Sequence, residues 1–420
     1  MTARAGGVAG FRARGGAGEA VDALADAYVW GYPLVAVHRA RRAHPATSGG
    51  LAGRGRLATA ADRTVVAPNN DTLYASGWFD LTAGDVVVEV EPMDRPDRCW
   101  SVMLLDAYTH VAYVSRRLHG TGGTRARVTL DPGTPPADIA RDLVAMGTPT
   151  LWVLARVLVA GPDDLGAARA AQSRIHVYQP GAGRRRSAPA RSAARDAGPA
   201  GEAVAGAAGF FAALRAALAI DPPAPWHPPL PPSAAAALDG TPPSAAVVEA
   251  ARAAEARIRA GRGVDRTGNG WGTRSRGADF GHDVTYRAAY ARFSLAGHLP
   301  AENRTYARVV GSGEPVVLRF PAGDEPPVDG FWSLSAYGPD MFFADNPIGR
   351  YSIGDRTAGL RRAADGSLAL LVGHRRPADD ANWLPAPAGP YVLALRAYEG
   401  RPEVVDATWF PPDVTPGEAP

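Results

Sequence analysis

The stretch that decides the fold lies near the C-terminus, where GFWSLSAYGPD (residues 330–340) is followed by DNPIGRYSIGDR (345–356) and NWLPAP (382–387). Aromatic and aliphatic residues recur in it at the alternating spacing of β-strands. Asn, Asp, Gly and Pro interrupt the alternation at intervals that are typical of turns. The pattern predicts an antiparallel β-sandwich over residues 301–420.

A second stretch, APNNDTLYASGWFDL at residues 67–81, shows the same alternation. Strand-like runs continue beyond it, and the nearly continuous apolar runs at residues 99–105 and 151–159 are typical of central strands. We therefore predict a first β-sandwich over residues 57–160. We also expect residues 67–81 and 330–409 to face one shared cleft.

The remaining segments are patterned as helices and connectors. Residues 19–42 carry apolar side chains at helical spacing, and Pro33 among them predicts a kink or a break. Residues 1–18 have no periodicity, so we expect disorder there. Ala-rich helices alternate with Pro-, Gly- and Arg-rich loops, of which residues 181–200 are the least regular.

These patterns divide the chain into five parts and place it in the α+β class, with a helical part and two β-sandwich domains. The predicted parts are a disordered tail (1–18), an N-terminal helix and loop (19–56), a first β-sandwich (57–160), a helical block (161–300) and a C-terminal β-sandwich (301–420).

The composition excludes several classes of function. The 420 residues carry a formal net charge of only +3, and the sequence contains arginine but no lysine. No stripe combines basic with aromatic residues, so we expect no nucleic-acid partner. No segment approaches the roughly 20 apolar residues that span a bilayer, and no secretion signal is visible, so we expect a cytoplasmic protein without a membrane partner.

Motifs for cofactors are also missing from the sequence. It contains no phosphate-binding loop and no dinucleotide fingerprint, so we expect no cofactor. The only cysteine, Cys99, lies in an apolar run and is better interpreted as a small core residue than as a nucleophile. The nine histidines are scattered, so we expect no metal site, although distant histidines could still converge on one.

Polar side chains are concentrated in PNNDTLY, residues 68–74. One interpretation is a site in which Asn69, Asn70 and Thr72 bind a polar ligand. Asp71 would then act as an acid or base and Tyr74 as a hydroxyl donor. The alternative, slightly favoured for any single residue, is an Asx-type turn that sets the register of the strand.

Asp106 is a second candidate acid or base. It stands directly after the apolar strand in LLDAYTH, residues 104–110. Burial at such a position raises the pKa of a carboxyl group unless the group is paired. The favoured alternative is a structural role, in which Asp106 accepts hydrogen bonds from Asn70 or from a loop amide.

Strict alternation in FWSLSAY predicts one core face and one pocket face. Ser335 and Tyr337 share a face with Phe331 and Ser333, whereas Trp332 lies on the opposite, apolar face. We assign Tyr337 as a candidate catalytic hydroxyl donor, Ser335 as a ligand contact and Trp332 as an apolar wall.

Three further candidates follow in the C-terminal stretch. Arg350 could clamp an anion, although an ion pair with Asp340 or Asp345 across a turn is favoured. Asn382 and Trp383 lie in a loop that two prolines restrict. The Trp383 ring could stack on a ligand, but packing against a neighbouring domain is slightly favoured.

Taken together, the motifs resemble a bacterial two-domain family of unknown function, whose halves are domains of unknown function 1254 and 1214. The resemblance covers most of the chain and implies a helical part plus two jelly-roll-like antiparallel β-sandwich domains. In the first half it is carried by YPL (32–34), APNNDTLY (67–74), WFDL (78–81) and LLDAYT (104–109). In the second half it is carried by GFWSLSAY (330–337), NPIGRYSIGDR (346–356), DGSL (365–368), NWLPAP (382–387), LRAY (395–398) and TWFPP (408–412).

Three hypotheses of function stay open at this point. The favoured one is an enzyme that acts on a small organic molecule by hydrolysis, isomerisation, elimination or cyclisation, in specialised metabolism, with its cleft between the two β domains. The second is a non-catalytic protein that binds a glycan or a lipid-like metabolite. The third is a structural or assembly protein. A homodimer is left open.

Overall fold

The computed structural model describes residues 16–44, 50–63, 65–136, 142–181, 188–189, 206–240, 243–261 and 263–417. The disorder expected for residues 1–18 falls mostly outside these ranges, and the first helix begins at Gly16. Most of the loop predicted at residues 181–200 also lies outside the described residues.

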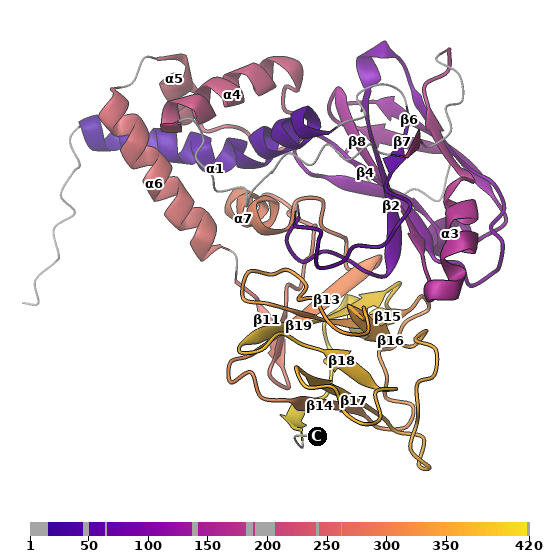
Figure 1. Ribbon diagram of the computed structural model, residues 1–420. Helices are drawn as coiled ribbons and strands as arrows, with labels where there is room; N and C mark the ends of the chain where they lie inside the picture. The colour runs from indigo at the N-terminus through magenta and orange to yellow at the C-terminus, as the bar shows by residue number, and fades with distance from the viewer. Residues whose placement is uncertain are drawn as a thin grey trace, which may run out of the picture.

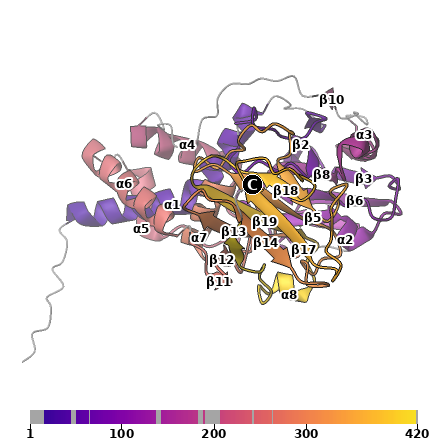
Figure 2. The same ribbon diagram turned by 60° about the horizontal axis from the view of Figure 1, so that its bottom comes forward.

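The chain forms two β-sandwiches and a helical block, so the predicted α+β class is confirmed. Figure 1 shows the first sandwich beside the helices and the C-terminal sandwich below both. The turned view in Figure 2 again has the long helices on one side of the molecule and most of the strands on the other.

The first sandwich consists of a six-stranded and a four-stranded sheet. In spatial order the larger sheet contains β10 (Ala188–Pro189), β1 (Ala52–Gly53), β2 (Thr72–Asp80), β8 (Thr150–Leu158), β4 (Trp100–Leu105) and β5 (Val111–Ser115). The smaller sheet contains β7 (Leu143–Met146), β6 (Thr124–Leu130), β3 (Val86–Val90) and β9 (Ile175–Tyr178).

Apolar side chains from both sheets fill the space between them, which explains the alternation in the sequence. Strands β4 and β8 occupy interior positions of the larger sheet, as their apolar runs predicted. Helix α3 (Leu165–Gln172) packs on the same core, and β9 follows it and pairs with β3. The strands of the first sandwich therefore run from Ala52 to Pro189, beyond both of the predicted boundaries at residues 57 and 160.

The C-terminal sandwich also pairs a six-stranded with a four-stranded sheet. The larger sheet contains β11 (Arg266–Gly268), β12 (Trp271–Thr273), β13 (Asn303–Val310), β19 (Tyr391–Tyr398), β15 (Trp332–Tyr337) and β16 (Ser352–Gly354). The smaller sheet contains β18 (Trp383–Pro385), β17 (Leu368–Gly373), β14 (Val316–Phe320) and β20 (Val414–Pro416). Most strand pairs are antiparallel, and the pair β17–β18 is parallel.

The helical block is built around α1 (Gly16–Ala43), which contacts all of the other long helices. These are α4 (Gly206–Ile220), α5 (Pro232–Asp239), α6 (Ser244–Ala260) and α7 (Val284–Ser294). Short turns of helix join strands at η1 (Leu81–Ala83), α2 (Arg116–His119), η2 (Pro162–Asp164) and α8 (Pro402–Val405).

Helix α1 continues through Pro33, so a break at this proline does not occur. A proline inside a helix costs about 3 kcal/mol, because it removes a hydrogen bond and crowds the preceding turn. Leu34 and its neighbours Tyr32 and Val35 are buried against the surrounding helices. We attribute the continuity of the helix to this packing, which outweighs the local preference. Among the described helices, none combines the length and the apolar surface needed to cross a bilayer.

The packing of α1 on α4 gives a direct test of the fold. A methyl group on Gly31 would overlap the side chain of Leu214, which is fully buried. We expect Gly31→Ala to lower the free energy of unfolding by about 1–3 kcal/mol, measured by urea denaturation. Gly166→Ala in α3 is the matched control, since its added methyl group meets open space. Equal stability of the two variants would contradict the close contact.

Candidate functional site

The two patterned stretches meet between the sandwiches. Ser333 Oγ donates a hydrogen bond to the Asp71 carboxylate at 2.7 Å, although the two residues lie 262 positions apart. Tyr337 OH donates to the carbonyl oxygen of Pro68 at 2.7 Å. The two stretches therefore meet, whereas the shared cleft that we expected between them stays a prediction. We call this contact between residues 67–74 and strands β15 and β19 the junction.

Strand β15 presents one face to the junction and one to the C-terminal core. Trp332 and Leu334 pack in that core. Ser333, Ser335 and Tyr337 lie on the opposite face, as the alternation in the sequence predicted. All three are buried, so this face is covered by the first sandwich rather than by solvent.

The PNNDTLY run forms a turn that also reaches across the junction. Asn69 Oδ1 accepts from the backbone N–H of Asp71 at 2.6 Å, which is the Asx-type turn that we considered as the structural alternative. The amide nitrogen of the same Asn69 donates to the Tyr398 hydroxyl group on β19. Asn70 instead donates to the backbone of Ala58 within the first sandwich.

Asp71 is the buried carboxyl group at the centre of the junction. Burial raises the pKa of Asp71 above its ordinary value, although Arg396 and the Ser333 hydroxyl group act in the opposite direction. Arg396 is buried on β19 and donates to the carbonyl oxygen of Ala67 at 3.1 Å. Asp71 therefore holds its proton to a higher pH than an exposed aspartate does.

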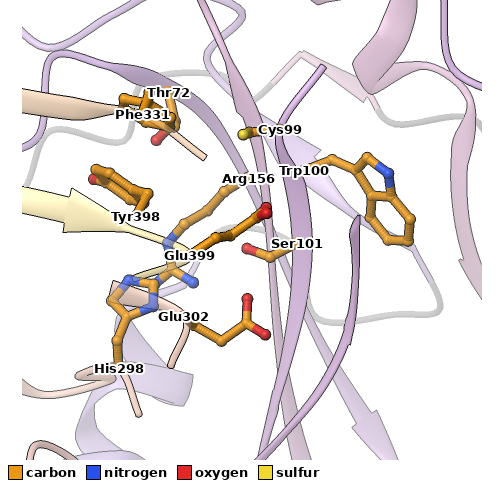
Figure 3. Close-up of a pocket in the computed structure, with 10 residues that line it drawn as sticks. All are labelled: Thr72, Cys99, Trp100, Ser101, Arg156, His298, Glu302, Phe331, Tyr398 and Glu399. Carbon is orange, nitrogen blue, oxygen red and sulfur yellow. The ribbon is translucent and has the colours of Figure 1, made fainter. Parts of the chain in front are cut away.

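A small cavity lies beside the junction and has a volume of about 20 Å³, which is room for one water molecule. It is much smaller than the roughly 300–1,000 Å³ of ordinary ligand pockets. Figure 3 shows Arg156 entering the middle of the lining with its guanidinium group next to the ring of His298. The lining residues are Thr72, Cys99, Trp100, Ser101, Arg156, His298, Glu302, Phe331, Tyr398 and Glu399.

Arg156 lies in the middle of β8 and is only 5% exposed. Its terminal nitrogens contact the Met103 sulfur at 3.8 and 3.9 Å, and its guanidinium carbon lies 5.2 Å from the Tyr74 ring centre. Among the described residues its Nε atom has no hydrogen-bond partner, and neither has the hydroxyl group of Thr72. Within the described residues no carboxylate forms an ion pair with Arg156, so its charge is left without a direct counter-ion.

The two glutamates of the cavity are held by arginines of the first sandwich. Glu302 accepts from Ser115 Oγ at 2.9 Å and from Arg117 Nε at 2.6 Å. Glu399 accepts from Arg116 Nε at 3.1 Å. These contacts cross between the two sandwiches and surround the cavity with charged hydrogen bonds.

Burial sets the protonation of two other lining groups. It lowers the pKa of His298 well below its ordinary value, and the positive charges of Arg156 and Arg396 act in the same direction. His298 is therefore neutral at physiological pH. Burial raises the pKa of Cys99 to about 12, so Cys99 is a protonated thiol and a poor nucleophile.

Three residues of the site, Arg156, Arg396 and His298, were not among those predicted from the sequence. A signal for the two arginines is present, because each is a single charge inside a strand that is otherwise largely apolar, in LWVLARVL and YVLALRAY. Charged residues are almost never fully buried without a partner, so an arginine in such a strand indicates a polar site. No local pattern marks His298, which lies in a loop and reaches the cavity only through the fold.

Asp106 lies in a second polar cluster, at the opposite end of the large sheet from Asp71. Its carboxylate accepts from the backbone N–H groups of Tyr108 at 2.8 Å and His110 at 2.9 Å, and from His110 Nδ1 at 3.1 Å. Arg287 from α7 donates to His110 Nε2 at 2.8 Å and also to His227 Nε2. The favoured structural alternative, a bond to a loop amide, is therefore what this carboxylate forms.

The hydrogen bonds of this cluster assign its charges. Burial lowers the pKa of His110, and it lowers the pKa of His227 to about 3. Burial by itself raises the pKa of Asp106, but the neighbouring His110 outweighs it and the pKa lies below its ordinary value. Because each Nε2 atom accepts from Arg287, we assign two neutral imidazoles between an ionised Asp106 and a charged Arg287.

This arrangement leaves the two histidines no lone pair for a substrate proton. Burial lowers the pKa of Arg287 to about 10, so it remains charged at neutral pH. The cluster joins the β4–β5 loop of the first sandwich to α7 and to the segment between α4 and α5. Asp71 and Asp106 therefore do not share one site. In the part of the chain that the structure describes, no group of three or more His, Cys, Asp and Glu side chains could hold a metal ion.

The remaining predicted residues lie inside the C-terminal sandwich. Trp332 and Trp383 are buried, and Trp383 Nε1 donates to the carbonyl oxygen of Gly373 at 2.9 Å. Arg350 donates to the backbone oxygens of Asp380 and Trp383 at 2.8 and 2.7 Å, so the favoured ion pair with Asp340 or Asp345 is wrong. Asn382 donates to the carbonyl oxygen of Ala369 at 2.9 Å and lies outside the cavity lining.

Comparison with known proteins identifies both halves of the chain. Residues 52–179 match the family model of DUF1254, and residues 305–402 match that of DUF1214, both described as proteins of unknown function. The crystal structure of the VPA0106 protein from Vibrio parahaemolyticus is similar at 20% identity and a TM-score of 0.68, over 95% of this chain and 100% of that one. An uncharacterised protein from Burkholderia cenocepacia is 14% identical with a TM-score of 0.46, over 89% and 84%. No curated protein matches the sequence.

The hydrogen bond across the junction predicts a loss of stability when its donor is removed. Ser333→Ala leaves the Asp71 carboxyl group buried without this hydroxyl partner. We expect the free energy of unfolding to fall by about 1–3 kcal/mol, measured by urea denaturation. Ser294→Ala, at an exposed position at the end of α7, is the control and should leave stability nearly unchanged. If both variants are equally stable, the bond contributes nothing to docking.

The neutral His227 predicts a pH dependence. The pKa of His227 in the folded protein, about 3, lies below the ordinary value of 6.5. As the pH falls below 6.5 the unfolded chain takes up a proton that the folded protein does not, so the folded protein loses stability. Between about pH 7.5 and about pH 5.5 this loss is about 1.4 kcal/mol for one such histidine. His227→Gln keeps an acceptor for Arg287 but does not titrate. The free energy of unfolding of this variant should therefore fall by about 1.4 kcal/mol less than that of the wild type over the same pH range. Exposed His282→Gln should behave like the wild type, and an unchanged slope in His227→Gln would contradict a neutral His227.

Proposed function

The chain belongs to the two-domain family of DUF1254 and DUF1214 proteins, whose function is unknown. We propose a function for it from its own residues. The proposed function is that of an enzyme that acts on a small organic molecule at the junction between the two sandwiches. Hydrolysis, isomerisation, elimination or cyclisation would each need a proton to be moved there.

One observation carries the proposal: within the described residues, two buried polar atoms of the cavity lining, Thr72 Oγ1 and Arg156 Nε, have no hydrogen-bond partner. In a purely structural interface nearly all buried donors are paired, because an unpaired one costs about 1–3 kcal/mol. Two such groups in one small cavity support a surface that is shaped for a ligand.

The buried carboxyl group of Asp71 is the proposed acid or base. Its raised pKa brings it closer to neutral pH, where an acid–base group works best. Tyr74 and the hydroxyl group of Thr72 lie on the same strand and would orient the substrate. Tyr337 is less suited to that task than we expected, because its hydroxyl group already donates to Pro68.

The substrate would enter when the two sandwiches separate slightly, since the cavity as it stands holds only one water molecule. The partly exposed ion pair of Arg356 with Asp97 between the sandwiches contributes little to keeping them closed, so the buried hydrogen bonds of the junction are what would have to open. A cytoplasmic setting, a role in specialised metabolism and a homodimer remain predictions alongside this proposal.

A structural role without catalysis is the second candidate, and one observation favours it. Trp332, Trp383 and Tyr337 are buried, and none of them lines the cavity. This is the arrangement expected if the aromatic motifs serve to hold the fold together. It also removes the exposed tryptophan faces on which a glycan-binding role was based.

The proposal is tested by turnover in a complex mixture. Purified protein is incubated with a small-molecule extract of bacterial cells, and mass spectrometry follows the compounds that are consumed. We expect Asp71→Asn to lower the rate of consumption by about 10²–10⁴-fold, because amide cannot replace carboxyl in proton transfer. Asp324→Asn, in an exposed turn, is the matched control and should retain the full rate.

Two results would count against the enzyme. A folded Asp71→Asn variant with the wild-type rate would remove Asp71 from the mechanism. An extract left unchanged by the wild type would favour the structural role instead.

A further inference from the structure

Arg156 differs from every other buried arginine in the described part of the chain. Five arginines are buried there: Arg98, Arg156, Arg287, Arg304 and Arg396. Four of them donate to oxygen or to histidine nitrogen. Arg156 instead donates to the sulfur of Met103, lies over the ring of Tyr74 and has the His298 ring beside it (Figure 3). A thioether is a weak acceptor, so the five donors of this guanidinium group are largely unused.

We infer that Arg156 binds the carboxylate group of the substrate, so that the substrates are small organic monocarboxylic acids. The inference rests on the proposed function, because it takes the cavity to be part of the substrate site. Guanidinium is planar and its paired N–H groups match the two oxygens of a carboxylate. The unpartnered hydroxyl group of Thr72 on the neighbouring strand lines the same cavity and supplies another donor.

The charges around the cavity leave one positive charge in excess. Glu302 and Glu399 line it, but Arg117 and Arg116 pair with them. Of the groups that remain in the lining, Arg156 is positive and His298 is neutral. A buried charge without a counter-ion is unfavourable, and a bound anion would relieve it.

The same surroundings favour a monoanion over a dianion. Because Arg117 and Arg116 pair with Glu302 and Glu399, the single charge of Arg156 balances one negative charge on the ligand. A second negative charge would be left without a counter-ion. Phe331 and Tyr398 stack with ring centres 4.1 Å apart at the edge of the cavity. They offer an apolar surface to the carbon part of a short acid. Inorganic phosphate is partly a dianion at neutral pH and has no apolar part.

Thermal denaturation of the full chain with added acetate or propionate tests this inference. We expect the melting temperature to rise and to saturate with either acid, and inorganic phosphate at equal ionic strength to produce no saturable rise. Arg156→Met has a similar length without the charge, so it should abolish the acetate effect. Arg156→Lys keeps the charge but not the planar fork, and its dissociation constant for acetate should be at least about tenfold higher.

The control is Arg361→Met, which removes an exposed arginine that pairs with Asp379. It should respond to acetate as the wild type does. An equal acetate effect in Arg156→Met would overturn the inference, as would an equal response to phosphate or no saturable response to any of these anions. If Arg156→Met does not fold, Arg156→Lys decides alone, and an unchanged dissociation constant would overturn the inference.

The binding assay and the turnover assay separate this inference from the proposed function. Acetate binding that depends on Arg156, together with normal turnover by Asp71→Asn, would contradict the proposed mechanism and leave the carboxylate site standing. Loss of turnover in Asp71→Asn, together with acetate binding that is unchanged in the Arg156 variants, would contradict the carboxylate site alone.

Discussion

The hydrogen bond from Ser333 to Asp71 joins the two sandwiches where both partners are buried. A carboxyl group in that position must be paired or protonated, because burying an unpaired charge is costly. Asp71 is met by a hydroxyl group from β15, and its loop is held by Tyr337 and Tyr398 from the other sandwich. The docking of the sandwiches therefore follows from the need to satisfy this one polar turn.

Two of the buried arginines differ in how their charge is compensated. Arg98 is enclosed by the carboxylates of Asp94 and Asp164 and by the carbonyl oxygen of Leu158, so it fixes the fold of the first sandwich. Arg156 lies on the central strand of that sandwich without such partners. The binding role that we infer for Arg156 rests on this difference between a saturated and an unsaturated guanidinium group.

The cluster of Asp106, His110 and Arg287 belongs to the first kind. The neutral imidazole of His110 bridges the carboxylate and the guanidinium group by hydrogen bonds on both ring nitrogens. It ties the first sandwich to the helical block. The two carboxylates with the most suggestive surroundings in the sequence thus have different tasks, because one faces the junction and the other faces α7.

The sequence by itself determined the α+β class, the central strands and the faces of β15, because alternation with a period of two assigns Ser333 and Trp332 to opposite sides wherever the strand lies. Only the tertiary structure decided which polar groups are paired. The partners of Asp71, Arg156 and Arg350 come from segments far away in the chain or from loop carbonyl oxygens. Sheet order and docking bring such groups together, and neither is encoded in a local pattern.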